Sequence, residues 1–370
     1  MPSLIQLLIM ITGFVVVFVL PELDVNFASY YFSAVAIVNL ALIFGAPLGA
    51  IIQRDIVKGQ DYDKYLVTIV FNILMAGLII SEIDDNITTF IILASLLIGL
   101  VYYFKGVLIA QNKIKISYFY NLIRGLTLPL GALASVNFVK NFEIFNSFLL
   151  IAIILMISVN WKELRRCNFP DLQEYLSITK STLYLAGSNI LIWLFFQLPR
   201  INFFQLNSTE MVVLIQSMSV PLALLSIFEA RGPYLLNKVL LGKSKPVLYS
   251  VFILILFYGS SFIFFNIALI FLRNYGHPIY INSEIAAVFF VLSFVLSFHF
   301  DLVRRLLALT SEEKIFKLFI PSISFYGIFA FILLSYMENF SYWLLVLIFL
   351  VLYVPSMIFA YKKFPCLGKQ

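Results

Sequence analysis

The chain has 370 residues, of which 62% are hydrophobic and only 12% are charged, and its mean hydropathy is +1.00. No water-soluble domain tolerates this composition on its surface, so the sequence indicates an integral membrane protein. Basic residues at the membrane surface explain the formal net charge of +6, and no nucleic-acid partner is needed to account for it.

Apolar segments of about 17 to 25 residues predict twelve membrane-spanning helices. The first six are expected at Leu4–Leu20, Tyr30–Ile52, Tyr65–Ile80, Ile87–Ala110, Ile116–Phe138 and Ile144–Val159. The second six are expected at Thr182–Phe204, Met211–Phe228, Val247–Leu272, Ile285–Leu302, Ile315–Tyr336 and Tyr342–Tyr361. No signal peptide is expected, because the first eight residues contain no basic side chain and the first apolar segment is followed by PELD.

The distribution of basic residues agrees with this count, because Lys and Arg collect on the cytoplasmic side of membrane proteins. If the N-terminus is inside, the inner loops and the C-terminal tail hold nearly all of the 25 basic residues, and the outer loops hold Lys140 and Arg273. We therefore expect an all-α polytopic membrane protein with about twelve transmembrane helices and with the N- and C-termini in the cytoplasm. Cys167 and Cys366 then lie in a reducing compartment, where a disulfide is not expected.

The longest polar connection divides the chain into two groups of six helices. Residues 1–160 form the first half and residues 181–370 the second. Residues 161–180 form a cytoplasmic linker with the sequence WKELRRCNFPDLQEYLSITK, which predicts a short amphipathic helix on the inner surface. Two halves of six helices are typical of transporters built from repeats.

Signatures of enzymes are scarce in this sequence. It contains no P-loop, HExxH, GxSxG or CxxC motif and only two histidines. The predicted outer loops are too short to hold the acidic and histidine groups of a membrane enzyme that acts on lipid-linked sugars. Transport is therefore favoured over catalysis, and no cofactor and no metal site is expected.

Two arginines fall inside predicted helices. Arg124 lies in NLIRGLTLPLG, residues 121–131, about 12 Å from the inner end of the fifth helix. It either extends back to the inner headgroups or faces a water-filled cavity and binds phosphate. Arg200, in FFQLPRINFF, lies near the outer end of the seventh helix and has the same two explanations. Arg54, at the inner end of the second helix, is either a topogenic anchor or a contact for an anionic headgroup.

A glycine and proline motif lies in the second helix. In GAPLGAIIQRD, Gly45 and Gly49 are four residues apart, with Pro47 between them. The spacing indicates either close helix packing or a bend used in alternating access.

The candidates for ion coupling lie in the second half. Glu229 is at the inner end of the eighth helix, and His299 and Asp301 are at the inner end of the tenth. Asp301 either pairs with Arg304 or Arg305 one turn on, or forms a proton- or cation-coupling pair with His299. The first six helices are expected to contain no buried acidic residue.

Two segments resemble a known family. SYYFSAVAIVNLALIFGAPLGAIIQRDI, residues 29–56, resembles the second helix of polysaccharide flippases, in which aromatic and small residues lead to a Gly and an inner Arg. Residues 182–220 are similar to the family's seventh helix, which ends in an acidic-Arg pair; Arg200 matches the Arg, and Pro199 stands in place of the acid. With the twelve-helix plan, the similarity to the Wzx-type O-antigen flippases of the multidrug/oligosaccharidyl-lipid/polysaccharide exporter superfamily covers nearly the whole chain. The chain is short for that family, and its first helix lacks the usual polar lead-in, as expected for a clipped N-terminus.

This resemblance implies a MATE-like fold in the bacterial inner membrane. It also implies translocation of an undecaprenyl-pyrophosphate-linked oligosaccharide to the periplasmic leaflet, coupled to H⁺ or Na⁺. Its partners are then membrane lipids, the lipid-linked oligosaccharide and polysaccharide polymerase machinery. Two alternatives remain open: an O-antigen polymerase or other membrane glycosyltransferase, and a MATE-type drug or cation antiporter.

Overall fold

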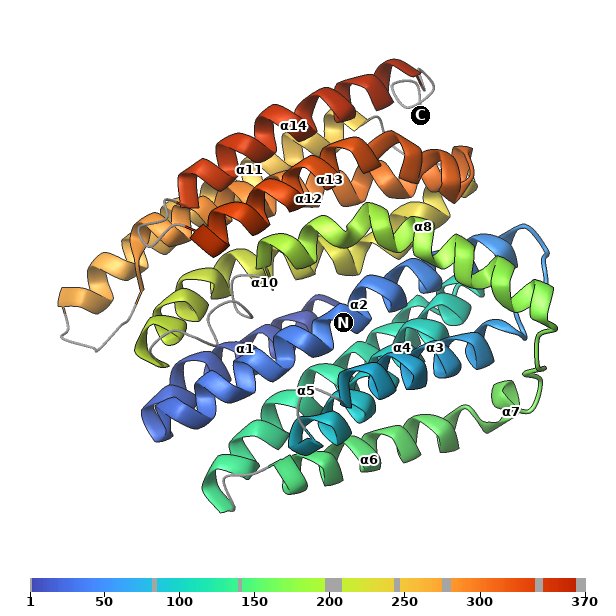
Figure 1. Cartoon of the computed structure of the whole chain (residues 1–370), viewed down its shortest axis with the longest axis horizontal. Helices are drawn as coiled ribbons and strands as arrows, with labels where there is room; N and C mark the ends of the chain where they lie inside the picture. The colour runs from blue at the N-terminus through green and yellow to red at the C-terminus, as the bar shows by residue number, and fades with distance from the viewer. Residues whose placement is uncertain are drawn as a thin grey trace. The chain divides into compact units, whose positions relative to one another are not determined.

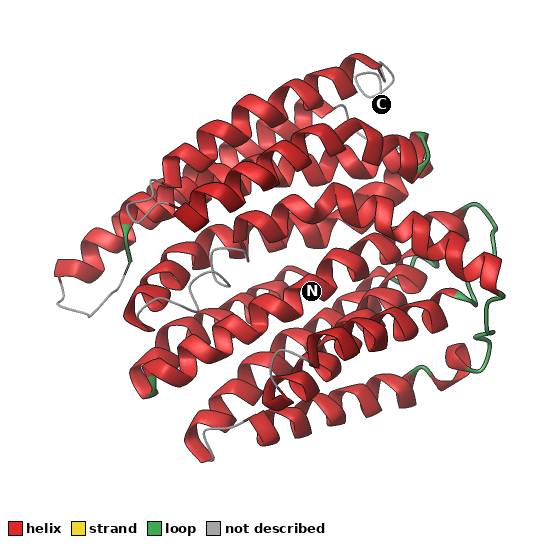
Figure 2. Ribbon diagram, in the orientation of Figure 1, coloured by secondary structure: helices red, strands yellow, loops and turns green. Residues whose placement is uncertain are grey.

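The computed structural model describes residues 2–81, 85–138, 142–196, 208–242, 247–274, 281–336 and 342–363, and within these ranges it contains helices joined by loops and no strand (Figure 2). The chain divides into two compact units, Met1–Ala186 and Gly187–Gln370. This division falls inside a helix, because α8 (Leu172–Phe196) begins in the first unit and ends in the second.

Each apolar segment expected from the sequence overlaps a helix (Figure 1). The first unit contains α1 (Pro2–Leu23), α2 (Val25–Val57), α3 (Tyr65–Ser81), α4 (Asp85–Ala110), α5 (Ile114–Phe138), α6 (Phe142–Val159) and the short α7 (Trp161–Leu164). The second contains α10 (Ser208–Leu240), α11 (Val247–Asn274), α12 (Ser283–Leu309), α13 (Glu312–Tyr336) and α14 (Tyr342–Lys363).

The linker differs from its prediction. Residues 172–180 do not form a separate surface helix but are the first turns of α8. The helix starts there because Asp171 and Glu174 cap it reciprocally: the Glu174 amide donates to Asp171 Oδ1 at 2.8 Å and the Asp171 amide donates to Glu174 Oε2 at 3.0 Å. The amphipathic pattern was read correctly as helical, but it contains no stop signal before the apolar run.

Local sequence sets several other boundaries. Asp24 caps α2 by accepting hydrogen bonds from the amides of Asn26 and Phe27, both at 3.0 Å. Gly59, just after α2, has a φ of 75°, the left-handed conformation in which helices often end. Other helices continue through internal prolines, as membrane helices often do: Pro21, Pro47, Pro129, Pro221, Pro233, Pro321 and Pro355.

Within the described residues, four helices contain segments long and apolar enough to cross a membrane, namely α4, α10, α11 and α12. Large apolar side chains also lie exposed in rows, which a water-soluble surface rarely carries. On α6 they include Ile151 and Ile154, exposed by 58% and 59%, and on α11 they include Ile263 and Phe264, exposed by 61% and 71%. These features are those of an all-α, membrane-embedded protein.

Each unit is built around one central helix. In the first unit, α4 packs against α2, α3, α5 and α6, and α1 packs against α5. In the second unit, α12 packs against α10, α11, α13 and α14. The long helices of the described ranges form two sets of six, α1 to α6 and then α8 with α10 to α14. In each set, the fourth helix contacts the second, third, fifth and sixth.

Glycines make a close helix crossing in the first unit. A Cβ atom on Gly49 of α2 would lie 2.9 Å from the carbonyl oxygen of Tyr102 in α4, and one on Gly106 of α4 would lie 2.7 Å from the carbonyl oxygen of Gly49. Gly232 of α10 stands at the same position in its helix as Gly49, and Arg304 of α12 at the same position as Gly106. There, the Arg304 guanidinium occupies the space against Gly232 that a side chain would need.

Candidate functional site

Two cations gather on one tyrosine in the first unit. Tyr102 and Lys105 are three residues apart on α4, so they share a face of that helix, and Arg124 approaches from α5. Lys105 Nζ lies 5.6 Å and Arg124 Cζ 5.8 Å from the centroid of the Tyr102 ring. Arg124 Nη1 also donates a hydrogen bond to the Tyr102 hydroxyl at 3.3 Å. We call these three residues the Tyr102 cluster.

The Tyr102 cluster is shielded from solvent. The exposed fraction is 6% for Lys105 and 7% for Tyr102, and Arg124 is half-buried. Burying a cation inside apolar helices is costly, and such residues are therefore functional candidates by default. The structure shows that Arg124 contacts Tyr102 of α4, and both explanations that the sequence allowed for Arg124 stay predictions.

The sequence reasoning missed Lys105 as a site residue. The three-residue spacing to Tyr102 was a usable signal, because it places an aromatic ring and a cation on one helix face. That Arg124 meets both of them depends on how α4 packs against α5, which the sequence does not specify.

The predicted anion contact Arg54 has a neighbouring carboxylate. Arg54 Nη2 lies 2.7 Å from Asp55 Oδ1, and the hydroxyl of Tyr65 donates to Asp55 Oδ2. Asp55 is only 3% exposed. This corrects the expectation that the first six helices contain no buried acid: α2 extends past Ile52 to Val57 and therefore includes Asp55. A paired carboxylate neutralises much of the charge that Arg54 would offer to a substrate.

The predicted hinge motif is part of a continuous helix. Pro47 and Gly49 are buried in α2, which runs through them without a break. The contacts of Gly49 are those of close packing against α4. Gly45 also lies in α2, but its surroundings are outside the described part of the structure.

The two candidates on α12 face different neighbours. His299 is completely buried, and its Nε2 lies 2.6 Å from the carbonyl oxygen of Ser188 in α8. Its ring packs edge-on against Phe319 of α13 and Tyr353 of α14, with centroid distances of 5.0 and 5.2 Å. His299 Nδ1 has no hydrogen-bond partner among the described residues.

Asp301 instead pairs with Arg305 along its own helix, as one reading of the sequence predicted. Arg305 Nε donates to Asp301 Oδ2 at 2.9 Å. Asp301 lines a cavity beside α10 and α11, whereas His299 contacts α8, α13 and α14. The structure therefore does not bring His299 and Asp301 together as a coupling pair. Arg200 and the side chain of Glu229, the other two candidates of the second half, lie outside the described residues.

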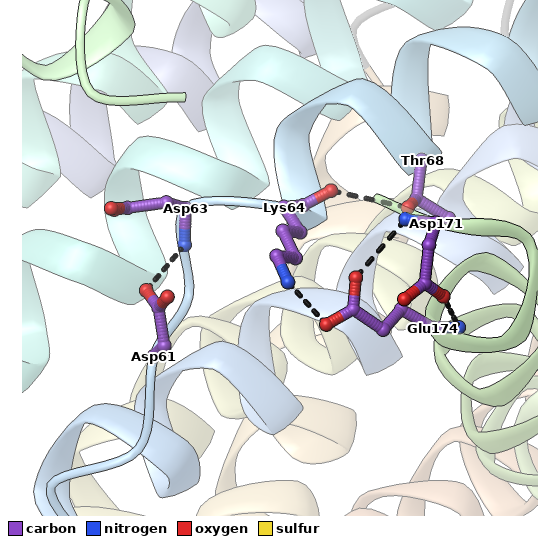
Figure 3. Close-up of polar contacts among 6 residues, drawn as sticks. All are labelled: Asp61, Asp63, Lys64, Thr68, Asp171 and Glu174. Atoms are coloured by element: carbon purple, nitrogen blue, oxygen red, sulfur yellow. Dashed lines mark hydrogen bonds and ion pairs between the residues drawn. The ribbon is translucent and has the colours of Figure 1, made fainter. Parts of the chain in front are cut away.

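A polar network joins the start of α3 to the start of α8 (Figure 3). Lys64 forms an ion pair with Glu174, the residue that also caps α8. Two turns along α3, the Tyr175 hydroxyl donates to Asn72 Oδ1 at 2.6 Å, and Asn72 Nδ2 donates to Thr179 Oγ1 at 3.4 Å. These contacts fasten the part of α8 that belongs to the first unit to α3.

Cys167 lies between α7 and α8, close to the same region. Its thiol is half-buried and lies 3.6 Å from the Tyr103 hydroxyl. Burial raises the pKa of the Cys167 thiol above its ordinary value of 9.0, so the thiol is protonated and unreactive at neutral pH. Within the described residues, no cluster of metal-ligating side chains is found.

No model of a known protein family matches this sequence, and neither a curated protein nor a solved structure shows significant similarity to it.

Proposed function

We propose that this protein is a polytopic transporter that moves an undecaprenyl-pyrophosphate-linked oligosaccharide from the cytoplasmic to the periplasmic leaflet of the bacterial inner membrane. The observation that carries the proposal is the Tyr102 cluster, in which Lys105 and Arg124 approach one aromatic ring between apolar helices. A transporter of this kind needs cations that bind a pyrophosphate away from hydrocarbon, and Arg and Lys both bind phosphate oxygens.

The proposal includes twelve membrane-spanning helices in two MATE-like halves, with both termini in the cytoplasm. Its support is the charge distribution in the sequence and the repeated contact pattern around α4 and α12. Because the same ordinal helices meet in each unit, we infer that the two units are repeats of one six-helix plan. Transporters with such repeats bind substrate between them and alternate the side to which the site opens.

A cation antiporter is the second candidate, because Asp55 is a buried carboxylate in the first unit. Its ion pair with Arg54 counts against this candidate, since a cation site needs an acid whose charge is available. Ion coupling of the flippase by H⁺ or Na⁺ remains part of the proposal, with Asp55 added to His299, Asp301 and Glu229 as a residue to test.

The proposal is tested by deleting the gene in its host and extracting the undecaprenyl-linked oligosaccharides. Single completed repeats that accumulate on the cytoplasmic face are the expected result. Single repeats on the periplasmic face would mean that translocation works and polymerisation fails, and an O-antigen polymerase would then replace the flippase.

A further inference from the structure

A cavity of about 260 Å³ lies within the second unit, where the end of α10 meets the start of α11 and the end of α12. Three of its lining residues are basic, namely Arg231, Lys238 and Arg305, and one is acidic, Asp301. The sequence analysis singled out only Asp301, as an ion-coupling candidate. The cavity is distinct from the Tyr102 cluster, which lies in the first unit.

One of the three cations is already neutralised. Arg305 is 1% exposed; its Nε bonds Asp301 at 2.9 Å and its Nη2 donates to the Ser250 hydroxyl of α11 at 3.1 Å. A buried pair with this many hydrogen bonds is a fixed part of the wall. The charge of Asp301 also acts on Arg231, but one carboxylate cannot neutralise Arg305, Arg231 and Lys238 together.

Arg231 and Lys238 are the two remaining cations. They are seven residues apart, two turns along one face of α10. The Arg231 guanidinium lies 5.8 Å from the ring centroid of Phe228, and Lys238 Nζ lies 4.5 Å from that of Tyr234. Within the part of the chain that the structure describes, neither forms an ion pair. Aromatic rings thus hold both cations at the cavity without cancelling their charge.

The surroundings of the cavity indicate what kind of anion fits. Its volume is below the roughly 300 Å³ at which pockets begin to enclose drug-sized ligands, so it suits one small charged group and not an oligosaccharide. On α11, Ile253 and Leu254 line the cavity, while the neighbouring Phe252 and Ile255 are exposed by 59% and 54%. An apolar chain attached to the bound group can therefore lie along α11.

We propose that this cavity binds a phosphate group through Arg231 and Lys238, and that the apolar face of α11 beside it selects the phosphate of an anionic phospholipid. Arg and Lys supply charge-assisted hydrogen bonds to the phosphate oxygens. The proposal does not depend on the transported substrate, because it concerns binding alone.

The test uses the purified full chain in neutral detergent, titrated with phosphatidylglycerol in mixed micelles, with phosphatidylcholine or with inorganic phosphate alone. Binding is followed by the shift in the thermal unfolding midpoint. The unchanged protein is compared with Arg231→Gln, with Lys238→Gln and with the double variant. The control is Lys58→Gln/Lys362→Gln, which removes the same charge from two exposed positions elsewhere.

Phosphatidylglycerol is expected to stabilise the unchanged protein and the control alike, with at least about tenfold weaker binding in the double variant. If inorganic phosphate instead shifted the thermal unfolding midpoint as much as phosphatidylglycerol does, the selection of a lipid would be contradicted. If that shift were saturable and were lost in the double variant, the cavity would be an anion site that does not select a lipid. Equal binding by the unchanged protein and the double variant, or an equal loss in the control, would overturn the proposal. Each single variant gives a separate readout if the double variant does not fold, since Arg231 is exposed.

Discussion

The guanidinium of Arg124 donates a hydrogen bond to the hydroxyl of Tyr102 at 3.3 Å and lies 5.8 Å from the centroid of the same ring. Tyr102 thus orients the Arg124 guanidinium, a cation on the largely apolar helix α5. Since Lys105 approaches the same ring, the two charges converge although they belong to different helices.

Changes in the Tyr102 cluster are expected to lower transport. Arg124→Ala and Lys105→Met each remove one charge, and we expect export of surface polysaccharide to fall by at least about tenfold in a complemented deletion strain, since one charge-assisted contact is lost. Arg124→Lys should retain part of the export, because the charge remains but the planar guanidinium does not. Arg165→Ala, at an exposed position, is the control. Full export from Arg124→Ala at normal expression would exclude that residue from the mechanism.

The crossing of α2 and α4 predicts a steric effect on stability. Gly49→Ala and Gly106→Ala each place a methyl group against a backbone oxygen, at 2.9 and 2.7 Å. We expect each to reduce the free energy of unfolding by about 1 to 3 kcal/mol, measured as thermal unfolding in detergent. Gly259→Ala in α11 is the matched control, because a Cβ there meets nothing within 4 Å. If all three changes had the same effect, the close crossing would be refuted.

The ion pair between Lys64 and Glu174 predicts a local effect on α8. Glu174→Gln removes the pair and weakens the cap, so hydrogen exchange over residues 172–180 should become faster. Glu313→Gln, which breaks a pair confined to α13, should leave those amides unchanged. If the amides of residues 172–180 exchanged at the same rate in both variants as in the unchanged protein, the ion pair would not hold α8 against α3.

The same pair predicts a pH dependence. The hydrogen bond to Glu174 raises the pKa of Lys64 above its ordinary value of 10.5. A raised pKa means that the folded state holds the proton more tightly, so the pair's contribution is complete below pH 10.5 and is lost as the pH rises through the raised pKa. The difference in unfolding midpoint between the unchanged protein and Glu174→Gln should be constant from pH 7 to 10 and should fall in stronger alkali to the part that comes from the weakened cap. A difference that changes around neutral pH would point to another group.

Cys167 predicts slow thiol chemistry. In a Cys366→Ser variant, maleimide labelling at pH 7 should be much slower for the native chain than for the denatured chain, because burial raises the pKa of the thiol. The rate should increase as the pH passes 9. Equal labelling of both forms at pH 7 would show an accessible thiolate instead.

The sequence was sufficient to predict the helices, because a hydrophobic run of membrane length and a break at polar residues are both local signals. It failed where one helix continues past a change of pattern. Asp55 lies beyond the apolar part of α2, and residues 172–180 merge into α8. In the first case the helix continues across residues whose polarity suggested a loop, and in the second it joins two segments whose different patterns suggested separate helices.

The pairing of Asp301 with Arg305 follows from their spacing on one helix, whereas groupings between helices could not be predicted. Arg124 was recognisable as a buried charge, but its contact with Tyr102 depends on the packing of α5 against α4. His299 and Asp301 are two residues apart on α12, and the helical rotation between such neighbours turns them to different contacts. The cavity beside Arg231 and Lys238 likewise forms only where α10, α11 and α12 meet.

The most direct test of the proposed function is a translocation assay with the purified protein in phospholipid vesicles that contain an undecaprenyl-pyrophosphate-linked oligosaccharide. A glycan-cleaving enzyme added outside reports how much of the oligosaccharide faces outward. With the unchanged protein, nearly all of the oligosaccharide should become accessible over time, whereas vesicles with Arg124→Ala should retain an inaccessible inner pool. If vesicles with the unchanged protein kept the same inaccessible pool as protein-free vesicles, with and without a proton or sodium gradient, the protein would not be a flippase for this substrate.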